Sequence, residues 1–250
     1  MSILSAKGLS KAYFLENERR CVVALQKLDV EVFEKECLAI VGPSGCGKST
    51  LLRLFAGFEH KSAGELLHHG HSIEKPDASR ALIPQDSGLF GWLSIEENVM
   101  LPLHVKGISL AEKREKAYAC MKKTGIEHFA KAYPRELSGG MRQRAALARA
   151  LAMEPDVLLL DEPFSALDEA SRESMDTMMQ AFLHENRITA VLVTHSIREA
   201  LLLADRIVVM AGEPGRILDI ITPSIPKNKR YDSHEIEQLY YDIVISLKNR

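Results

Sequence analysis

The sequence predicts an α/β fold: a parallel sheet with crossover helices, an antiparallel β subdomain and an inserted α-helical subdomain. Short, fully apolar runs that end in polar residues, such as the VLLLD before Glu162, are typical of buried parallel strands. These runs alternate with amphipathic segments of helical length, which is the order of a sheet with crossover helices. A long polar stretch of helical periodicity lies between them and predicts the insertion.

The first half of the chain predicts strand, turn and strand over 30–42, then a helix over 48–58 with Gly57 near its end. The segment from 63 to 83 has short alternating runs broken by glycines, which predicts antiparallel strands. From 94 to 131 the pattern is helical and polar, interrupted by Pro102, Gly107 and Gly125. We place the helical insertion at about 89–155.

The second half predicts strands at 156–163, 188–195 and 207–210, which alternate with helices at 171–186 and 196–206. We therefore expect one domain over 1–223. A linker with proline and lysine and then one helix are expected over 224–250.

Composition narrows the class of protein. The 250 residues are 46% apolar and 26% charged, with a net charge of −2, so no overall basic field indicates a nucleic-acid partner. The four cysteines form no C-x-x-C pair and are expected to be free thiols. No basic start is followed by a signal-peptide core, and no window approaches the apolar length of a membrane span. Work at a membrane would require another chain to cross it.

A phosphate loop follows the strand CLAIV. The stretch GPSGCGKST matches the pattern G-x-x-x-x-G-K-[ST] at every fixed position and opens a helix. Its glycines let backbone N–H groups surround phosphates, Lys48 is expected to reach the β- and γ-phosphates, and the Ser49 hydroxyl is expected to bind Mg²⁺. The residues of this loop are Gly42, Pro43, Ser44, Gly45, Cys46, Gly47, Lys48, Ser49 and Thr50.

Three further strand ends carry polar side chains suited to nucleotide hydrolysis. Asp161 ends a buried strand and is placed to hold Mg²⁺, and Glu162 is placed to polarise a water. His195 ends the strand ITAVLVTH, where a parallel sheet faces its ligand. Gln85 follows a short apolar run, and its amide can ligate Mg²⁺ and orient water. Taken singly, a strand-end turn or a surface loop would explain each of these residues.

The stretch LSGGMRQRAALARAL predicts a second anion site. Ser138, Gly139 and Gly140 precede good helix formers and supply free N–H groups and a hydroxyl at a helix N-terminus. One nucleotide needs one such cradle, so a second requires an explanation.

These motifs resemble, in order and spacing, those of the ATP-binding cassette (ABC) ATPases, which have a RecA-like P-loop NTPase core. The resemblance rests on the Walker A loop GPSGCGKST, the signature LSGGMRQR, the Walker B strand VLLLDEP, the SALD after it and the later His195, and extends from Ile3 to Pro223. It implies binding of ATP with Mg²⁺, a Q-loop role for Gln85, adenine stacking by Tyr13 and an intersubunit role for Asp168. Met141 departs from the commonest Gln after LSGG, which is read as the mark of one importer branch.

The resemblance also accounts for the second cradle. In this family two copies dimerise head to tail, so that the signature of one serves the nucleotide on the phosphate loop of the other. A single cassette without a span resembles the ATPase subunit of a bacterial importer, on the cytoplasmic face of the membrane. It implies a transmembrane permease as partner and, indirectly, an extracytoplasmic substrate-binding protein. The segments LFGWLSIEENVMLPL and GEPGRI resemble the nitrate, sulfonate and taurine branch, which also handles pyrimidine precursors.

Two other classes of protein remain open at this point. A soluble ABC ATPase of cofactor assembly would use the GLFGWL segment, with Trp92, to dock soluble partners instead of a permease. A nucleotide kinase with a phosphate loop would leave LSGG unexplained.

His68, His69 and His71 suggest a metal site, but no cysteine or acidic residue stands at ligand spacing from them. They are expected in a hairpin near Gly70, with His69 and His71 on one face.

Overall fold

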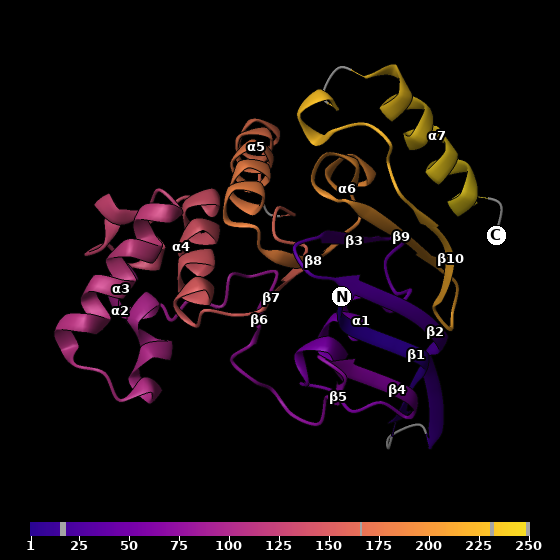
Figure 1. Cartoon of the computed structure of the whole chain (residues 1–250), viewed down its shortest axis with the longest axis horizontal. Coiled ribbons are helices and arrows are strands. Elements are labelled where there is room, and N and C mark those ends of the chain that lie inside the picture. Colours follow the sequence, from indigo (N-terminus) through magenta and orange to yellow (C-terminus); the bar gives the residue numbers. More distant parts are fainter. Residues whose placement is uncertain (16–18, 166, 231–232, 249–250) are drawn as a thin grey trace. The chain divides into compact units, whose positions relative to one another are not determined.

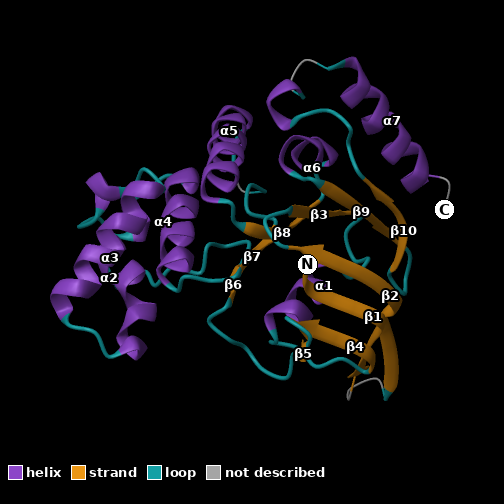
Figure 2. Ribbon diagram, viewed as in Figure 1, coloured by secondary structure: helices purple, strands orange, loops and turns teal. Residues whose placement is uncertain are grey.

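The computed structural model describes residues 1–15, 19–165, 167–230 and 233–248 (Figure 1). They divide into two compact units, one of Met1–Asp77 with Arg187–Arg250 and one of Ala78–Asn186. Both units combine strands with helices, which confirms the predicted α/β class (Figure 2). Among the described residues, no helix has both the length and the apolar character needed to cross a membrane.

The first unit contains an antiparallel sheet. Its strands are β1 (Ser2–Leu15), β2 (Arg20–Phe33), β4 (Ala63–His68) and β5 (His71–Ser72), in the order β2-β1-β4-β5. Each neighbouring pair is antiparallel. This sheet confirms the antiparallel strands expected after Ala63, and it adds β1, which the sequence analysis did not predict.

The turn between β4 and β5 corrects the expected faces of the histidines. His68 pairs directly with His71, and both His69 and Gly70 have positive φ, 48° and 78°. Such angles are typical of a two-residue type I′ hairpin. Directly paired residues of an antiparallel ladder lie on one face of the sheet, so His68 and His71 share a face. The expectation for His69 was wrong because strand alternation does not continue through a turn.

A second sheet of the first unit has β3 (Cys37–Val41) at its centre. β8 (Thr189–Thr194) and β9 (Arg206–Ala211) run parallel to β3 on either side, and β10 (Arg216–Ile221) is antiparallel to β9. Every residue of β3 and β8 is buried. The fully apolar runs therefore form the interior parallel strands, as predicted.

Three helices accompany this sheet. α1 (Lys48–Ala56) packs against β8, and α6 (Ile197–Leu203) packs against β3 and β8. α7 (His234–Lys248) contacts α6 and β9. α1 ends at Gly57, whose φ of 81° is left-handed, so the predicted glycine cap is confirmed.

The second unit joins a strand pair to a group of helices. β6 (Arg80–Ile83) runs parallel to β7 (Val157–Asp161). The sequence analysis wrongly included residues 80–83 among the antiparallel strands, because the partner of β6 lies more than seventy positions later in the chain and leaves no local signal. Three of the four residues of β6 are buried, as expected of an apolar strand that pairs in parallel with the buried strand β7.

The helices of the second unit are α2 (Ile95–Met100), α3 (Leu110–Lys123), α4 (Gly139–Ala152) and α5 (Glu169–Asn186). Ser94 and Ser109 begin α2 and α3 with capping boxes, in which each serine exchanges hydrogen bonds with a glutamate three residues later. One apolar core unites α2, α3 and α4, with the buried residues Val99, Leu103, Ala117, Met121, Ala145 and Ala148. The helices expected between 94 and 131 are thus confirmed.

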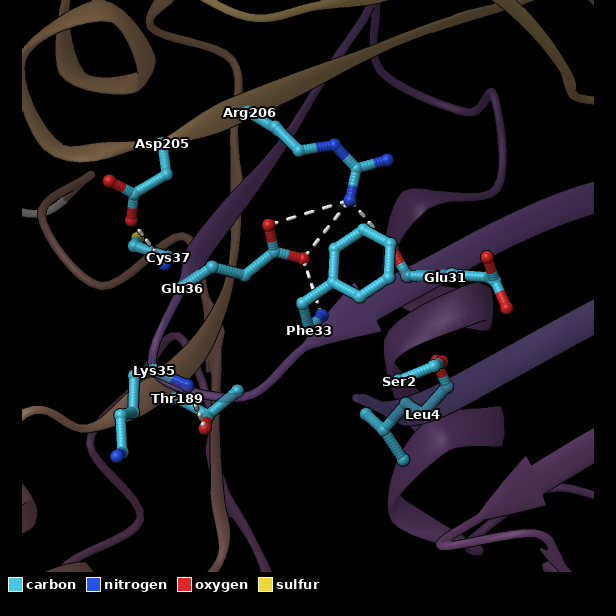
Figure 3. A network of polar contacts seen from close by, with 10 residues as sticks. All are labelled: Ser2, Leu4, Glu31, Phe33, Lys35, Glu36, Cys37, Thr189, Asp205 and Arg206. Carbon is cyan, nitrogen blue, oxygen red and sulfur yellow. Dashed lines mark hydrogen bonds and ion pairs between the residues drawn. The ribbon is translucent and has the colours of Figure 1, made fainter.

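A network of polar contacts anchors the start of β9 to the turn between β2 and β3 (Figure 3). Arg206 Nη1 donates to Glu36 Oε1 over 3.1 Å, and the guanidinium lies 5.0 Å from the centre of the Phe33 ring. The Cys37 amide donates to Asp205 Oδ2 over 2.7 Å. Burial raises the pKa of Glu36 above its ordinary value, although the Phe33 amide and Arg206 oppose the rise. These contacts fix β9 beside β3.

The close approach of β9 makes Gly42 indispensable. Gly42 follows β3 directly, and a Cβ at this position would lie 2.2 Å from the carbonyl oxygen of Met210 in β9. A backbone atom cannot move aside as the end of a flexible side chain can, so any larger residue would force β9 away from β3.

We expect Gly42→Ala to lower the free energy of unfolding by about 1–3 kcal/mol, the usual cost of overpacking a close-packed interior. Urea denaturation followed by circular dichroism measures the change. Gly91→Ala is the matched control, because no atom lies within 4 Å of its built Cβ, and surface changes of this kind are usually within about 0.5 kcal/mol. Equal stability of the two variants would contradict the packing argument.

Candidate nucleotide-binding site

The phosphate loop lies between the end of β3 and the start of α1. Gly45 and Gly47 have φ of 86° and 91°, values that side chains rarely allow, and a Cβ on Gly47 would lie 2.4 Å from the Leu25 side chain. Gly47 begins α1 without a side-chain cap, so the first N–H groups of this nine-residue helix are available for a ligand. The glycines thus allow the close backbone approach that a phosphate group requires.

Lys48 is the cation of this loop. Only 5% of the residue is exposed, and its Nζ donates to the carbonyl oxygens of Gly42 and Pro43, both over 2.9 Å. Phosphate oxygens are stronger acceptors for an ammonium group than these neutral carbonyls. Cys46 is buried within the loop, and burial raises the pKa of its thiol, which therefore stays neutral and unreactive.

His195 lies at the same edge of the sheet as the phosphate loop. Val41 of β3 pairs with Thr194 of β8, so the next residues along both strands, Gly42 and His195, leave the sheet at one edge. The turn is held by Thr194, whose hydroxyl donates to buried Glu199 over 2.6 Å and accepts from the Ser196 amide over 3.0 Å. The structure thus brings these two predicted elements together.

Tyr13 belongs to β1 in the same unit and is half-buried. Lys11 Nζ lies 4.5 Å from the centre of the Tyr13 ring, a cation–π contact. Glu59 pairs with the Lys11 ammonium over 2.8 Å, and the His60 carbonyl accepts from it over 2.9 Å. These contacts orient the tyrosine ring. The sequence analysis missed Lys11, which stands alone in a polar stretch without a motif.

The Walker B residues and Gln85 meet in the second unit. Ile83 of β6 pairs with Leu160 of β7, so Asp161, the last residue of β7, and Gln85, two residues after β6, lie at one edge of the strand pair. Gln85 Nε2 donates to Ser165 Oγ over 3.1 Å, and Ser165 Oγ donates to the Glu162 carbonyl over 2.9 Å. The sequence analysis did not identify Ser165 as a link between these two predicted residues.

Two details of this edge suit hydrolytic chemistry. Glu162 has a φ of 43°, which is rare for a residue with a side chain and is often found at functional sites. Within the described chain, the side-chain oxygen Oε1 of Gln85 accepts no hydrogen bond, whereas its backbone carbonyl accepts from Gln143 Nε2 over 3.3 Å. That side-chain oxygen, the Asp161 carboxylate and the Ser49 hydroxyl are the hard oxygen donors that Mg²⁺ prefers, so these residue types fit the ion.

The signature begins α4 as predicted. Ser138 is the N-cap, and its Oγ accepts from the Met141 amide over 3.3 Å. The first turn of α4 holds no acidic residue. Ser138, Gly140 and Arg144 are among the residues that line a hollow of about 450 Å³. A hydroxyl, a helix N-terminus and a cation therefore form one part of this lining and suit an anion, whereas Ile126, Phe129, Met141 and Met175 make the rest of it largely apolar.

The other predicted residues of the SALD segment are only partly described. Asp168 is exposed, and its carbonyl accepts from the Arg172 amide in the first turn of α5 over 2.9 Å. Ala166, in the middle of SALD, lies outside the described residues.

Comparison with known proteins agrees with this chemistry. The family model described as ABC transporter matches residues 25–165. The taurine import ATP-binding protein TauB of Roseobacter denitrificans is 44% identical over 87% of this chain and 81% of that protein. The aliphatic sulfonates import ATP-binding protein SsuB of Bacillus cereus is 36% identical over 94% of this chain and 92% of that protein.

A solved structure has the same fold. It is the dimeric structure of a post-hydrolysis state of the ATP-binding cassette MJ0796 bound to ADP and Pi. The two chains are 31% identical, with a TM-score of 0.76, over 88% of this chain and 98% of that one. The family match, the two relatives and the fold are consistent with the phosphate loop, the Walker B strand and the signature described above. The chain belongs to the ABC transporter family, as one of its ATP-binding proteins.

Proposed function

We propose that this protein is the ATP-hydrolysing subunit of a membrane ABC importer. The observation that carries the proposal is the phosphate loop beside His195 at one edge of a buried parallel sheet, in a chain whose relatives are import ATP-binding proteins. ATP binding and hydrolysis would drive a separate permease. The expected cargo is a small anion such as a sulfonate, nitrate or taurine, or a pyrimidine precursor.

The phosphate loop would bind the triphosphate. Residues Gly42 to Thr50 supply N–H groups, and Lys48 transfers its hydrogen bonds from the loop carbonyls to the β- and γ-phosphates. Tyr13 would stack on adenine, with Lys11 holding the ring in place.

Hydrolysis would depend on the strand-end residues. Glu162 accepts the proton of the attacking water, His195 donates a hydrogen bond to the γ-phosphate, and Gln85 orients the water. Ser49, Gln85 and Asp161 would hold Mg²⁺, which balances phosphate charge when bound. The link from Gln85 through Ser165 to the Glu162 backbone keeps the water-orienting amide and the base in one geometry.

The signature would complete the site of a second copy. The phosphate loop already supplies a cradle for one nucleotide, so Ser138, Gly139 and Gly140 are free to serve another, and the solved relative described above is a dimer. ATP held between the phosphate loop of one copy and the signature of its partner would join the dimer, and hydrolysis would release it. Asp168, exposed directly before α5, would contact the partner.

The permease would dock on the second unit. A hollow of about 330 Å³ there is lined by apolar residues, among them Leu82, Phe90, Leu101 and Met153. Trp92 is 75% exposed, and its ring centre lies 5.1 Å from that of Phe90. An exposed tryptophan beside an apolar hollow suits an anchor for a partner helix.

The loop that carries Trp92 is firmly held. Arg149 donates to the Gly88 carbonyl over 2.6 Å and to the Ser87 carbonyl over 3.1 Å. Buried Asn98 accepts from the Phe90 amide over 2.8 Å and donates to the Phe90 and Leu93 carbonyls, both over 3.1 Å. A rigid loop loses little entropy on binding, which favours docking.

The assembly would lie on the cytoplasmic face of the membrane, with this subunit peripheral and a substrate-binding protein contacting the permease from outside. We assign 1–223 to the ATPase domain, with its helical part at about 89–155, and 224–250 to a linker and helix. A role in cofactor assembly without transport is not favoured, because the named relatives are import proteins.

We expect Glu162→Gln to bind ATP normally and to hydrolyse it about 10²–10⁴-fold more slowly, because the general base is lost. Phosphate release measures turnover, and light scattering with ATP should detect a lasting dimer. Glu235→Gln, an exposed change on α7, is the control and should behave as wild type. Normal turnover by Glu162→Gln would place the base elsewhere.

We expect Trp92→Ala to leave basal ATPase activity unchanged and to weaken capture of the permease from detergent-solubilised membranes by about tenfold or more, as for an aromatic hot spot. Quantitative mass spectrometry of the captured proteins is the measurement. Tyr118→Ala removes another exposed aromatic side chain, from α3, and should leave capture intact. Undiminished capture by Trp92→Ala would exclude the docking role.

A further inference from the structure

The first unit contains a cavity of about 530 Å³ where α6 and α7 meet. Figure 1 shows α7 passing beside α6, and the two helices are in contact. The lining combines two guanidinium groups, Arg198 and Arg230, with the apolar side chains of Leu202 and Ile236. None of the nucleotide chemistry above uses these four residues.

Arg230 is almost fully buried, which is rare for an arginine. Only 3% of the residue is exposed. Its Nε donates to the Ile225 carbonyl over 2.8 Å, and its Nη1 donates to the carbonyls of Leu201 over 2.8 Å and Ala204 over 2.6 Å. The side chain therefore fixes the end of α6 to the segment that leads into α7.

Among the described residues, no carboxylate forms an ion pair with Arg230, although the charge of nearby Asp205 favours the charged guanidinium. In the described part of the chain its Nη2 makes no hydrogen bond and the guanidinium makes no ion pair. The nearby Asp205 carboxylate instead accepts from Lys227 over 2.8 Å and from the Cys37 amide. Burial lowers the pKa of Arg230, yet an arginine remains charged at neutral pH.

A buried cation with only neutral acceptors is costly, and an anion at its free edge would offset that cost. The other lining groups limit what that anion is. Hydroxyl groups of Ser196 and Ser233 add polar contacts, whereas Leu202 and Ile236 offer apolar surface. Glu237 also lines the cavity and repels a second negative charge. The lining therefore favours one anionic group joined to a short apolar body.

We propose that this cavity is a binding site for a small organic anion, whose sulfonate or carboxylate group contacts Arg230 Nη2 and whose apolar body contacts Leu202 and Ile236. No residue of the phosphate loop lines this cavity. His195 also lines the cavity, so a bound anion would lie beside the turn that carries this residue.

The test uses the full chain with saturating ADP and Mg²⁺, so that the phosphate loop is filled. The probe is sodium propanesulfonate, and ligand-observed NMR titration measures its binding. We expect saturable binding at least tenfold tighter than that of 1-propanol, which lacks the charge, or of sulfate, which lacks the apolar body. Absence of saturable binding, or equal binding of either comparison compound, would overturn the proposal.

Variants locate the site. Arg230→Gln should weaken binding at least tenfold, but it also removes bonds that fix α6, so its melting temperature must be compared with that of wild type. Ile236→Trp fills the cavity and leaves Arg230 intact, and it should abolish binding. Ile245→Trp is the matched control, because Ile245 is 54% exposed on the same helix, and binding should persist. Binding retained by folded Ile236→Trp would show that the anion binds elsewhere.

Discussion

The pairing of β3 with β8 and β9 is the constraint on which the rest of the molecule depends. All residues of β3 and β8 are buried, so their hydrogen bonds form away from water and their register is fixed. The register brings the phosphate loop and His195 to one edge. The approach of β9 is so close that only glycine fits at position 42. Gly42, the first residue of the phosphate loop, is therefore a packing residue of the sheet.

Hydrogen bonds from polar side chains hold the loops and turns that carry the predicted site residues. Thr194 and Glu199 fix the turn at His195, Ser165 links Gln85 to Glu162, and Asn98 with Arg149 supports the Trp92 loop. The bonds from Thr194 and Arg149 are short, 2.6 Å each, and come from buried or half-buried groups, whereas the 3.1 Å bond from Gln85 to Ser165 is exposed. Such bonds orient a side chain before a ligand arrives, which reduces the entropy lost on binding.

Local patterns predicted the elements that depend on local chemistry. The glycine end of α1, the serine start of α4 and the apolar strands β3, β7 and β8 followed from capping and burial. The analysis failed where structure depends on distant partners. β6 pairs with residues far along the chain, and β1 contains register shifts that break its alternation. Lys11 and Ser165 belong to no motif, and their contacts with Tyr13, Gln85 and Glu162 appear only in the folded chain. The roles assigned to the site residues remain predictions.

The second anion cradle leads to the central claim, that the signature of one copy completes the ATP site of the other. Two variants test it, Lys48→Ala and Ser138→Arg, each in a Glu162→Gln background that retains ATP. Each variant alone forms dimers in which both ATP sites carry one defect. If the signature acts across the interface, a mixed dimer combines the intact Lys48 of one copy with the intact Ser138 of the other, and one of its two sites has no defect. If each signature serves its own copy, both sites of the mixed dimer carry a defect.

The measurement is radiolabelled ATP retained through gel filtration, for each variant and for their mixture. We expect little ATP with either variant alone and up to about one ATP per mixed dimer, fewer where pairing is statistical. No gain in the mixture, with mixed dimers demonstrated by a tagged pull-down, would contradict the claim.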